Sequence, residues 1–170
     1  MKKLKFFAFA LVAAFGFAAC DSKDEEFTYE ESTVVMGGSQ SSNGSFFTFD
    51  KGVQTKTGLG DSGANVVFCF STIDDNFQFI SGTEATNEIV KATASETKFA
   101  VIGDATAAKF EKAVCSETKV EISNKLESGK KAVAFENANC KGFFEVVSYD
   151  AEKQDLTLKV WIQKAAEVAE

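Results

Sequence analysis

Residues 155–163 read DLTLKVWIQ, and apolar and polar side chains alternate along the whole stretch. Successive side chains of a β-strand point to opposite faces of its sheet. One face would therefore carry Leu156, Leu158, Val160 and Ile162. The other would carry Asp155, Thr157, Lys159, Trp161 and Gln163. This alternation predicts a strand with one face buried in a core.

Two further strands are predicted just before this one, joined by short polar loops. Residues 143–149 are rich in aromatic and β-branched side chains, and the polar segment 150–154 has the length of a hairpin loop. A third run, 131–136, leads into them through 137–142. The three runs predict an antiparallel meander in the C-terminal half of the core.

The N-terminal half contains short apolar or alternating runs separated by Gly, Ser, Asn and Asp. These predicted strands are 32–36, 45–50, 53–57, 65–70 and 77–80. The run NVVFCF at 65–70 is apolar on both faces and predicts a central strand covered on each side. Segment 37–44, GGSQSSNG, predicts a flexible loop; it lacks the strand-to-helix setting and the Lys of a phosphate-binding loop.

Helical signals are few. Asp104 can cap a helix over 105–114, in which Phe110 and Val114 lie four residues apart on one face. Segments 86–95 and 117–126 are ambiguous between helix and strand, because β-branched residues offset their Ala and Lys.

These patterns together predict the architecture. We expect one β-rich α+β domain over 32–164, made of mostly antiparallel short strands in a sandwich or partly open barrel, with one or two helices. A short tail, 165–170, would follow it. No internal repeat or second domain boundary is visible.

Composition excludes several classes of site. The chain has 170 residues, 18 of them Lys and 25 Asp or Glu, with no His and a formal net charge of −7. Without imidazole there can be no Ser-His-Asp triad, Cys-His pair, histidine base or histidine-ligated metal. The chain also lacks Arg. We therefore expect no nucleic-acid partner, since such partners need a basic surface, and no cofactor.

Residues 1–19 predict a secretory signal peptide. Lys2, Lys3 and Lys5 precede an apolar run over 6–17, which is shorter than the about 20 residues of a membrane-spanning helix. Ala18 and Ala19 lead directly into Cys20. Residues 20–31 then form an acidic segment with few apolar groups, which predicts a disordered tether.

This N-terminus resembles a bacterial lipoprotein precursor. The resemblance implies cleavage just before Cys20 and a diacylglyceryl group on its thiol, so that the membrane partner is reached through lipid. Phe17 departs from the aliphatic residue usual in that family. Secretion without lipid, with Cys20 an ordinary thiol, is the alternative.

The residues after Cys20 bear on location. Lys23-Asp24-Glu25 resembles the acidic export tag of Bacteroidota surface lipoproteins, which implies the outer face of the outer membrane. Asp21 supports the opposing interpretation, because an Asp after the lipidated Cys retains enteric lipoproteins at the inner membrane. Runs such as NVVFCF and DLTLKVWIQK within 32–164 are also similar to uncharacterised Bacteroidota-type surface lipoproteins, for which no catalytic residues are known.

Three cysteines remain in the body of the chain, so at least one has no disulfide partner there. Cys69 falls within a predicted core strand and is expected to behave as a small apolar residue. Cys115 and Cys140 fall near the ends of elements, and we predict a disulfide between them. Three buried thiols are the alternative.

Other candidate residues are carboxylates and aromatic rings. Asp74 and Asp75 could act as a carboxylate pair or as calcium ligands, but adjacent residues on an extended loop point apart, which favours a solvated turn. Trp161 and Tyr149 are candidates for a platform that stacks on a sugar ring. Packing of Trp161 beneath the helix at 105–114 is the alternative.

The sequence thus predicts a lipid-anchored, non-enzymatic interaction module at the cell surface that binds a glycan or an envelope protein. A structural envelope lipoprotein without a specific ligand is one alternative. A carboxylate-dependent surface hydrolase is another, less favoured one.

Overall fold

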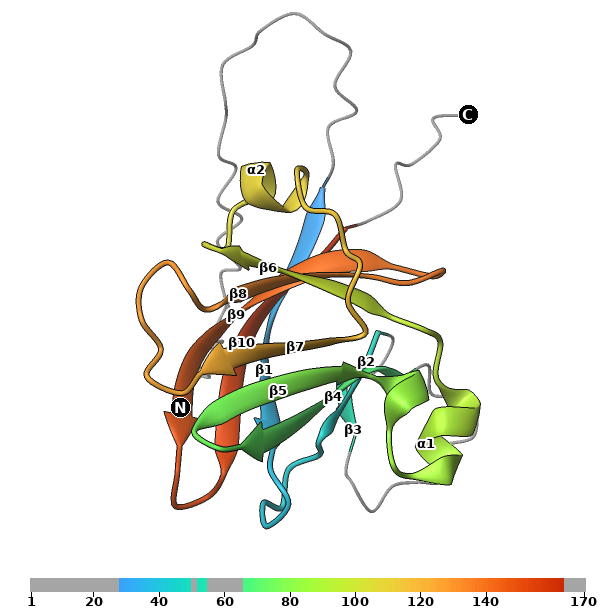
Figure 1. Ribbon diagram of the computed structural model, residues 1–170, viewed down its shortest axis with the longest axis vertical. Coiled ribbons are helices and arrows are strands. Elements are labelled where there is room, and N and C mark those ends of the chain that lie inside the picture. Colours follow the sequence, from blue (N-terminus) through green and yellow to red (C-terminus); the bar gives the residue numbers. More distant parts are fainter. Residues whose placement is uncertain (1–27, 50–51, 55–65, 164–170) are drawn as a thin grey trace, which may run out of the picture.

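The computed structural model describes residues 28–49, 52–54 and 66–163, and within them the chain forms two antiparallel sheets of five strands (Figure 1). Sheet A has the spatial order β1 (Tyr29–Gly37), β10 (Asp155–Gln163), β9 (Lys141–Asp150), β8 (Ala132–Glu136) and β6 (Lys98–Gly103). Sheet B has the order β3 (Gly52–Gln54), β2 (Phe46–Thr48), β4 (Val66–Ile73), β5 (Asn76–Ser81) and β7 (Lys119–Ser123). The predicted β-rich domain of mostly antiparallel strands is confirmed.

The main core lies between the two sheets and consists largely of phenylalanine. Phe68 of β4 stacks on Phe144 of β9 with ring centroids 5.0 Å apart, and Phe79 of β5 lies 4.6 Å from the same ring. All three side chains are fully buried. Aromatic rings therefore join the two sheets across the core.

The strand predicted over 155–163 is confirmed as β10, and its burial alternates as the pattern requires. β10 pairs with β9 on one side and β1 on the other. β1 begins at Tyr29, opposite Gln163, three residues before the predicted domain start. The predicted tether 20–31 was therefore too long at its C-terminal end; its residues 20–27 lie outside the described residues.

The apolar run at 65–70 corresponds to β4, the central strand of sheet B, as predicted. Phe68 faces the core between the sheets, whereas Val66 and Cys69 pack with Val90. Val90 belongs to α1 (Glu88–Thr93), whose N-cap Asn87 accepts hydrogen bonds from the backbone N–H groups of residues 89 and 90. A helix thus resolves the ambiguous segment 86–95 and covers the second face of β4, next to the short 3-10 turn Gly82–Glu84.

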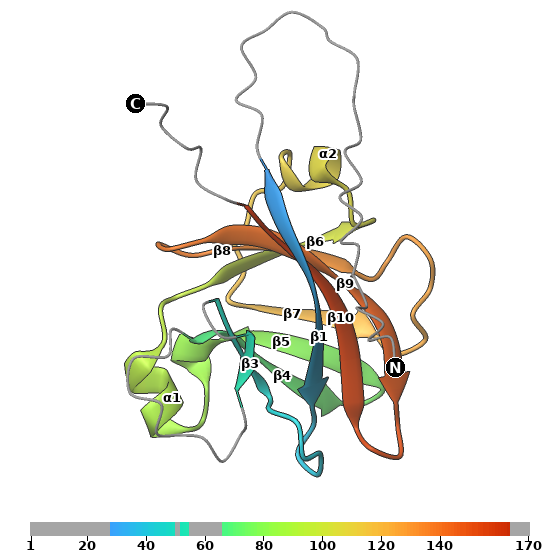
Figure 2. The ribbon, with the colours of Figure 1, turned by 180° about the vertical axis from the view of Figure 1, so that it is seen from behind.

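The helix predicted over 105–114 is much shorter than expected. α2 covers only Ala107–Phe110, and its cap is Thr106 instead of Asp104. α2 lies over the outer face of sheet A, which is the face turned away from sheet B (Figures 1 and 2). Phe110 packs there with Ala134 and Phe143. Val114 is 81% exposed, because the chain leaves the helix before the next turn could bring it to the same face. The ambiguous segment 117–126 contains strand β7.

The loop over 37–44 was predicted to be flexible, but hydrogen bonds hold it against the turn before β10. Ser41 Oγ donates to Asp155 Oδ1 at 2.5 Å, and Asn43 Nδ2 donates to the same oxygen at 2.9 Å. Gly38 N donates to the carbonyl oxygen of Gln154 at 2.7 Å. A Cβ on Gly37 would lie 2.3 Å from Ser41 Oγ, so the loop also requires glycine there.

Candidate functional site

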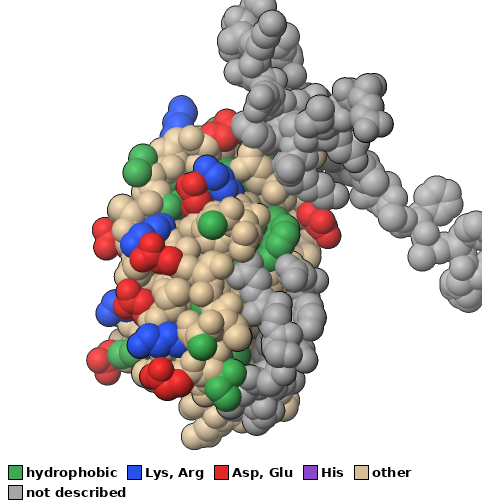
Figure 3. All heavy atoms as spheres, turned by 90° about the vertical axis from the view of Figure 1, so that its right-hand side faces the viewer, with side chains coloured by type: hydrophobic (Ala, Val, Ile, Leu, Met, Phe, Trp, Pro, Cys, Tyr) green, Lys and Arg blue, Asp and Glu red, His purple; other side chains and the backbone are tan. Residues whose placement is uncertain are grey.

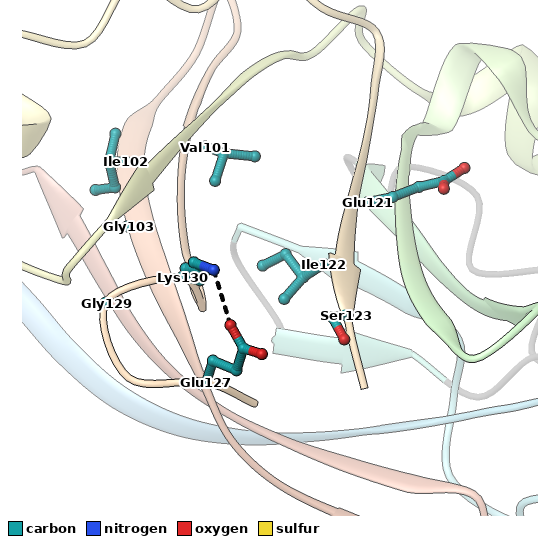
Figure 4. Close-up of a pocket in the computed structure, with 9 residues that line it drawn as sticks. All are labelled: Val101, Ile102, Gly103, Glu121, Ile122, Ser123, Glu127, Gly129 and Lys130. Carbon is teal, nitrogen blue, oxygen red and sulfur yellow. Dashed lines mark hydrogen bonds and ion pairs between the residues drawn. The ribbon is translucent and has the colours of Figure 1, made fainter. Parts of the chain in front are cut away.

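A cleft opens between β6 of sheet A and β7 of sheet B. Among the described residues the two strands are bridged just before β7 begins, where Phe99 N donates to Glu117 O at 2.7 Å and Glu117 N donates to Phe99 O at 3.2 Å. Beyond this bridge a pocket of about 480 Å³ lies between them (Figure 4). Residues 101–103 of β6, 121–123 of β7 and the loop residues Glu127, Gly129 and Lys130 line this β6–β7 cleft.

Two glycines shape the end of the cleft. Gly103 has φ +79° and Gly129 has φ +74°, both in the left-handed region that favours glycine. A Cβ on Gly103 would lie 2.6 Å from the carbonyl oxygen of Gly129. The loop before β8 can therefore lie directly against the end of β6, where Lys131 N donates to Gly103 O.

The walls of the cleft are apolar and its loop side is charged. Val101 is 52% exposed, whereas Ile122 is buried. Figure 4 shows these two side chains extending from opposite strands toward the space between them, with Glu121 pointing away from it. On the loop side Lys130 Nζ lies 2.8 Å from Glu127 Oε2, and this contact lowers the pKa of Glu127 and raises that of Lys130. Both groups therefore stay charged at neutral pH, which suits binding better than proton transfer.

Trp161 lies on the outer face of sheet A, partly buried among several neighbours. Its indole stacks on Phe143 with centroids 4.9 Å apart and an interplanar angle of 16°. Lys159 Nζ lies over the same ring, 5.1 Å from its centroid. Indole Nε1 donates to Glu31 Oε2 at 2.8 Å, and Glu31 also pairs with Lys159. The ring is thus packed among its neighbours, as the alternative interpretation expected.

Tyr149 lies on the opposite face of sheet A. It packs against the core between the sheets, with its ring 4.9 Å from that of Phe77. A sheet therefore separates Tyr149 from Trp161, and the two residues do not combine into the single platform that the sequence suggested.

Asp74 and Asp75 form the two-residue turn between β4 and β5. Both have positive φ, 45° and 64°, and both are exposed, as in a tight hairpin turn. Within the part of the chain that the structure describes, no group of three or more Cys, Asp or Glu side chains is placed to hold a metal ion. The turn interpretation of this segment is confirmed.

The predicted disulfide between Cys115 and Cys140 is wrong: Cys69, Cys115 and Cys140 are all thiols in the structure. Cys140 packs in the core between the sheets, whereas Cys115 packs with Phe110 and Phe143 on the outer face of sheet A. The two thiols, each in a connection between elements, therefore join different apolar clusters. Cys20, the predicted lipid site, lies outside the described residues.

Burial makes the body thiols poor nucleophiles, and this leads to a labelling prediction. Burial raises the pKa of Cys69 from 9.0 to about 12, and burial with the nearby Glu136 carboxylate raises that of Cys115 to about 11. At pH 8 iodoacetamide should label Cys115 in the folded chain about tenfold to a hundredfold more slowly than in urea, because so little thiolate is present. The rate should keep rising with pH up to about 11. A plateau near pH 9, read by mass spectrometry, would contradict the prediction.

Sequence reasoning missed the cleft because it missed β6. Residues 98–103, KFAVIG, are apolar enough for a strand, although the alternation pattern predicts none there. Their position at the sheet edge depends on pairing with β8, far along the chain. An apolar run followed by Gly103-Asp104, a turn signal, was the local sign that could have identified the strand.

The distribution of charge is visible on one face of the described residues. On the face shown in Figure 3, acidic and basic side chains are interspersed. Among the described residues no helix has the length and apolarity needed to span a bilayer. Compared with protein-family models, with curated proteins and with solved structures, the chain matches none.

Proposed function

We propose that this chain is a lipid-anchored binding module without catalytic activity, displayed at the outer membrane surface, and that it binds another envelope protein through the β6–β7 cleft. The observation that carries the proposal is the cleft itself, bounded by two strand edges with the apolar Val101 and Ile122 between them. An exposed apolar side chain such as Val101, which is 52% exposed in this concave site, favours contact with a partner.

The other features of the chain support a protein partner over a glycan. The Trp161 indole already stacks on Phe143 and lies under the Lys159 ammonium group, so a sugar ring would have to compete with these contacts. The absence of His from the sequence removes the commonest acid–base groups and favours binding over catalysis. The basic start and short apolar run before Cys20 support the lipid anchor.

The anchor is tested by Cys20→Ser. We expect the variant to lose incorporation of labelled palmitate completely and to move from the membrane fraction to the soluble fraction, because the acyl chains supply the membrane affinity. Cys115→Ser is the matched control and should keep both properties. Labelling that persists in Cys20→Ser would contradict the proposal. Protease treatment of intact cells then decides whether the domain faces outward.

The binding site is tested by photo-crosslinking in whole cells. A photoreactive amino acid at Val101, in the cleft, should give a discrete higher-mass adduct with an envelope protein. The control carries the photoreactive amino acid at Val147, which is 47% exposed on β9, and should give no such adduct. Equal adducts at both positions, or none at Val101, would exclude the cleft as the site. Hydrolase activity lost on Asp74→Asn would instead support the hydrolase alternative.

A further inference from the structure

The cleft-facing edge of β7 presents backbone groups that lack a strand partner. Thr118 O accepts from Ser81 N and Asn124 N donates to Asp75 O, both at 2.9 Å, so the even-numbered residues of this segment bond to β5. Backbone groups alternate sides along an antiparallel strand, so Lys119 and Glu121 direct their N–H and C=O toward the cleft. Among the described residues these groups make no backbone hydrogen bond to another strand.

The facing strand β6 does not act as the hydrogen-bonding partner of this edge of β7. Phe99 bonds to Glu117 across the strand edges, and by the same alternation the N–H and C=O of Val101 point into the cleft. The strands separate after the bridge, and the register of β6 against β8 shifts between Val101 and Gly103. The cleft is therefore lined on both sides by backbone donors and acceptors.

An unpaired strand edge of this kind is a template for another strand. Proline is the residue that most directly blocks such an edge, and the chain has none. The described edge of β7 has the sequence KVEIS, with Lys119 its one positive side chain. The edge is thus only weakly protected against strand addition.

We propose that the β6–β7 cleft binds an extended polypeptide segment that adds as a strand to β7, and that apolar residues alternate with basic ones in this segment. The inference rests on the proposed function and names the chemistry of its partner. Ile122 faces the core side of the sheet, so every second side chain of the added strand would enter the apolar cleft beside Val101 and Ile122.

The other side chains of the added strand would lie beside Lys119 and Glu121 on the outer face of sheet B. Glu121 Oε1 accepts from Gln78 Nε2 at 2.9 Å and lies 3.7 Å from Lys119 Nζ, and a basic side chain opposite Glu121 would add a favourable cross-strand pair to these contacts. The formal net charge of −7 also attracts a basic segment over longer distance. Main-chain bonds would then supply affinity, and the alternating side chains would supply selectivity.

A peptide series tests strand addition directly. The probe is an alternating lysine–valine peptide of about seven residues, enough to pass the edge of β7, titrated into the mature lipoprotein in detergent. N-methylation of alternate amides of one parity should weaken binding about thirtyfold, because the hydrogen bonds to the two carbonyl groups of Lys119 and Glu121 are lost, whereas the other parity should have a small effect. An alternating glutamate–valine peptide should bind at least about tenfold more weakly. Equal binding by both methylated forms, or no binding by the lysine–valine peptide, would overturn the inference.

A matched pair of variants tests the edge of the protein. Glu121→Pro removes the carboxylate and, from the backbone, only an N–H on the free edge, where proline is compatible with a strand, and should weaken peptide binding about tenfold. Glu121→Val keeps that N–H and should weaken it only a few-fold. A thermal melt checks the fold of both variants, and the methylated peptides give the same test should the proline variant unfold.

The outcomes also separate this inference from the proposed function. Suppose that the photoreactive amino acid at Val101 forms an adduct but that both N-methylated peptides bind equally well. The cleft would then bind a partner through side chains and not by strand addition. If Val101 gave no crosslink and the two methylated peptides bound equally, the proposed function would be contradicted as well. A different outcome is a discrete dimer of the mature protein that Glu121→Pro dissociates. This result would identify the added strand as a second copy of β7 and would contradict the proposal of a basic partner segment.

Discussion

Replacing Phe68 by alanine is expected to lower the free energy of unfolding by about 4 kcal/mol. The side chain is fully buried at the centre of the core. Its ring lies 4.8–5.9 Å from those of Phe47, Phe79, Phe99, Phe135 and Phe144. These rings come from both sheets, so they cannot close the cavity without changing how the sheets pack.

Urea denaturation followed by circular dichroism measures this loss. Phe49→Ala is the matched control, because Phe49 is 40% exposed and its removal should cost less than about 1 kcal/mol. Phe68→Leu should fall between the two. A loss below about 1 kcal/mol for Phe68→Ala would mean that this ring does not join the sheets as described.

Gly142→Ala is expected to destabilise the domain by about 3 kcal/mol through overpacking. A Cβ at this position would lie 2.4 Å from the carbonyl oxygen of Trp161 and 2.8 Å from Cζ of Phe135. The first atom belongs to the backbone of β10 and the second to the core. Neither can move away without disturbing the pairing of β9 with β10 or the packing between the sheets.

The same denaturation experiment tests this prediction. Ser148→Ala, an exposed change on the same strand, is the control and should alter the free energy of unfolding by less than about 0.5 kcal/mol. If Gly142→Ala proved as stable as this control, the close approach of β9 to β10 at residue 142 would be refuted.

Strands whose burial follows local alternation were predictable from the sequence. β10 was identified over its full length, and β4 was recognised as a central strand because it is apolar on both faces. The length of α2 was not predictable, because it depends on where Phe110 contacts sheet A and not on helix propensity. β6 was missed for a related reason, since its partner β8 lies about thirty residues further along the chain.

The candidate residues show the same division. Asp74 and Asp75 were correctly interpreted as a turn, since a two-residue connection between strands is a local property. The thiols of Cys115 and Cys140 were wrongly paired, because the apolar cluster that each of these loop residues joins depends on tertiary packing. Tyr149 and Trp161 were grouped as one platform for the same reason, although sheet A separates them.

The sequence by itself determined the fold class, the exclusion of histidine chemistry and the patterns that predict an export signal and a lipid site, because these depend on residue type and short spacing. The tertiary structure alone decided which strands form edges, which faces the aromatic residues occupy and where the two sheets part. A free edge is a strand that lacks a neighbour, and strand neighbours are chosen by contacts between residues far apart in the chain. The β6–β7 cleft therefore exists only in the assembled pair of sheets.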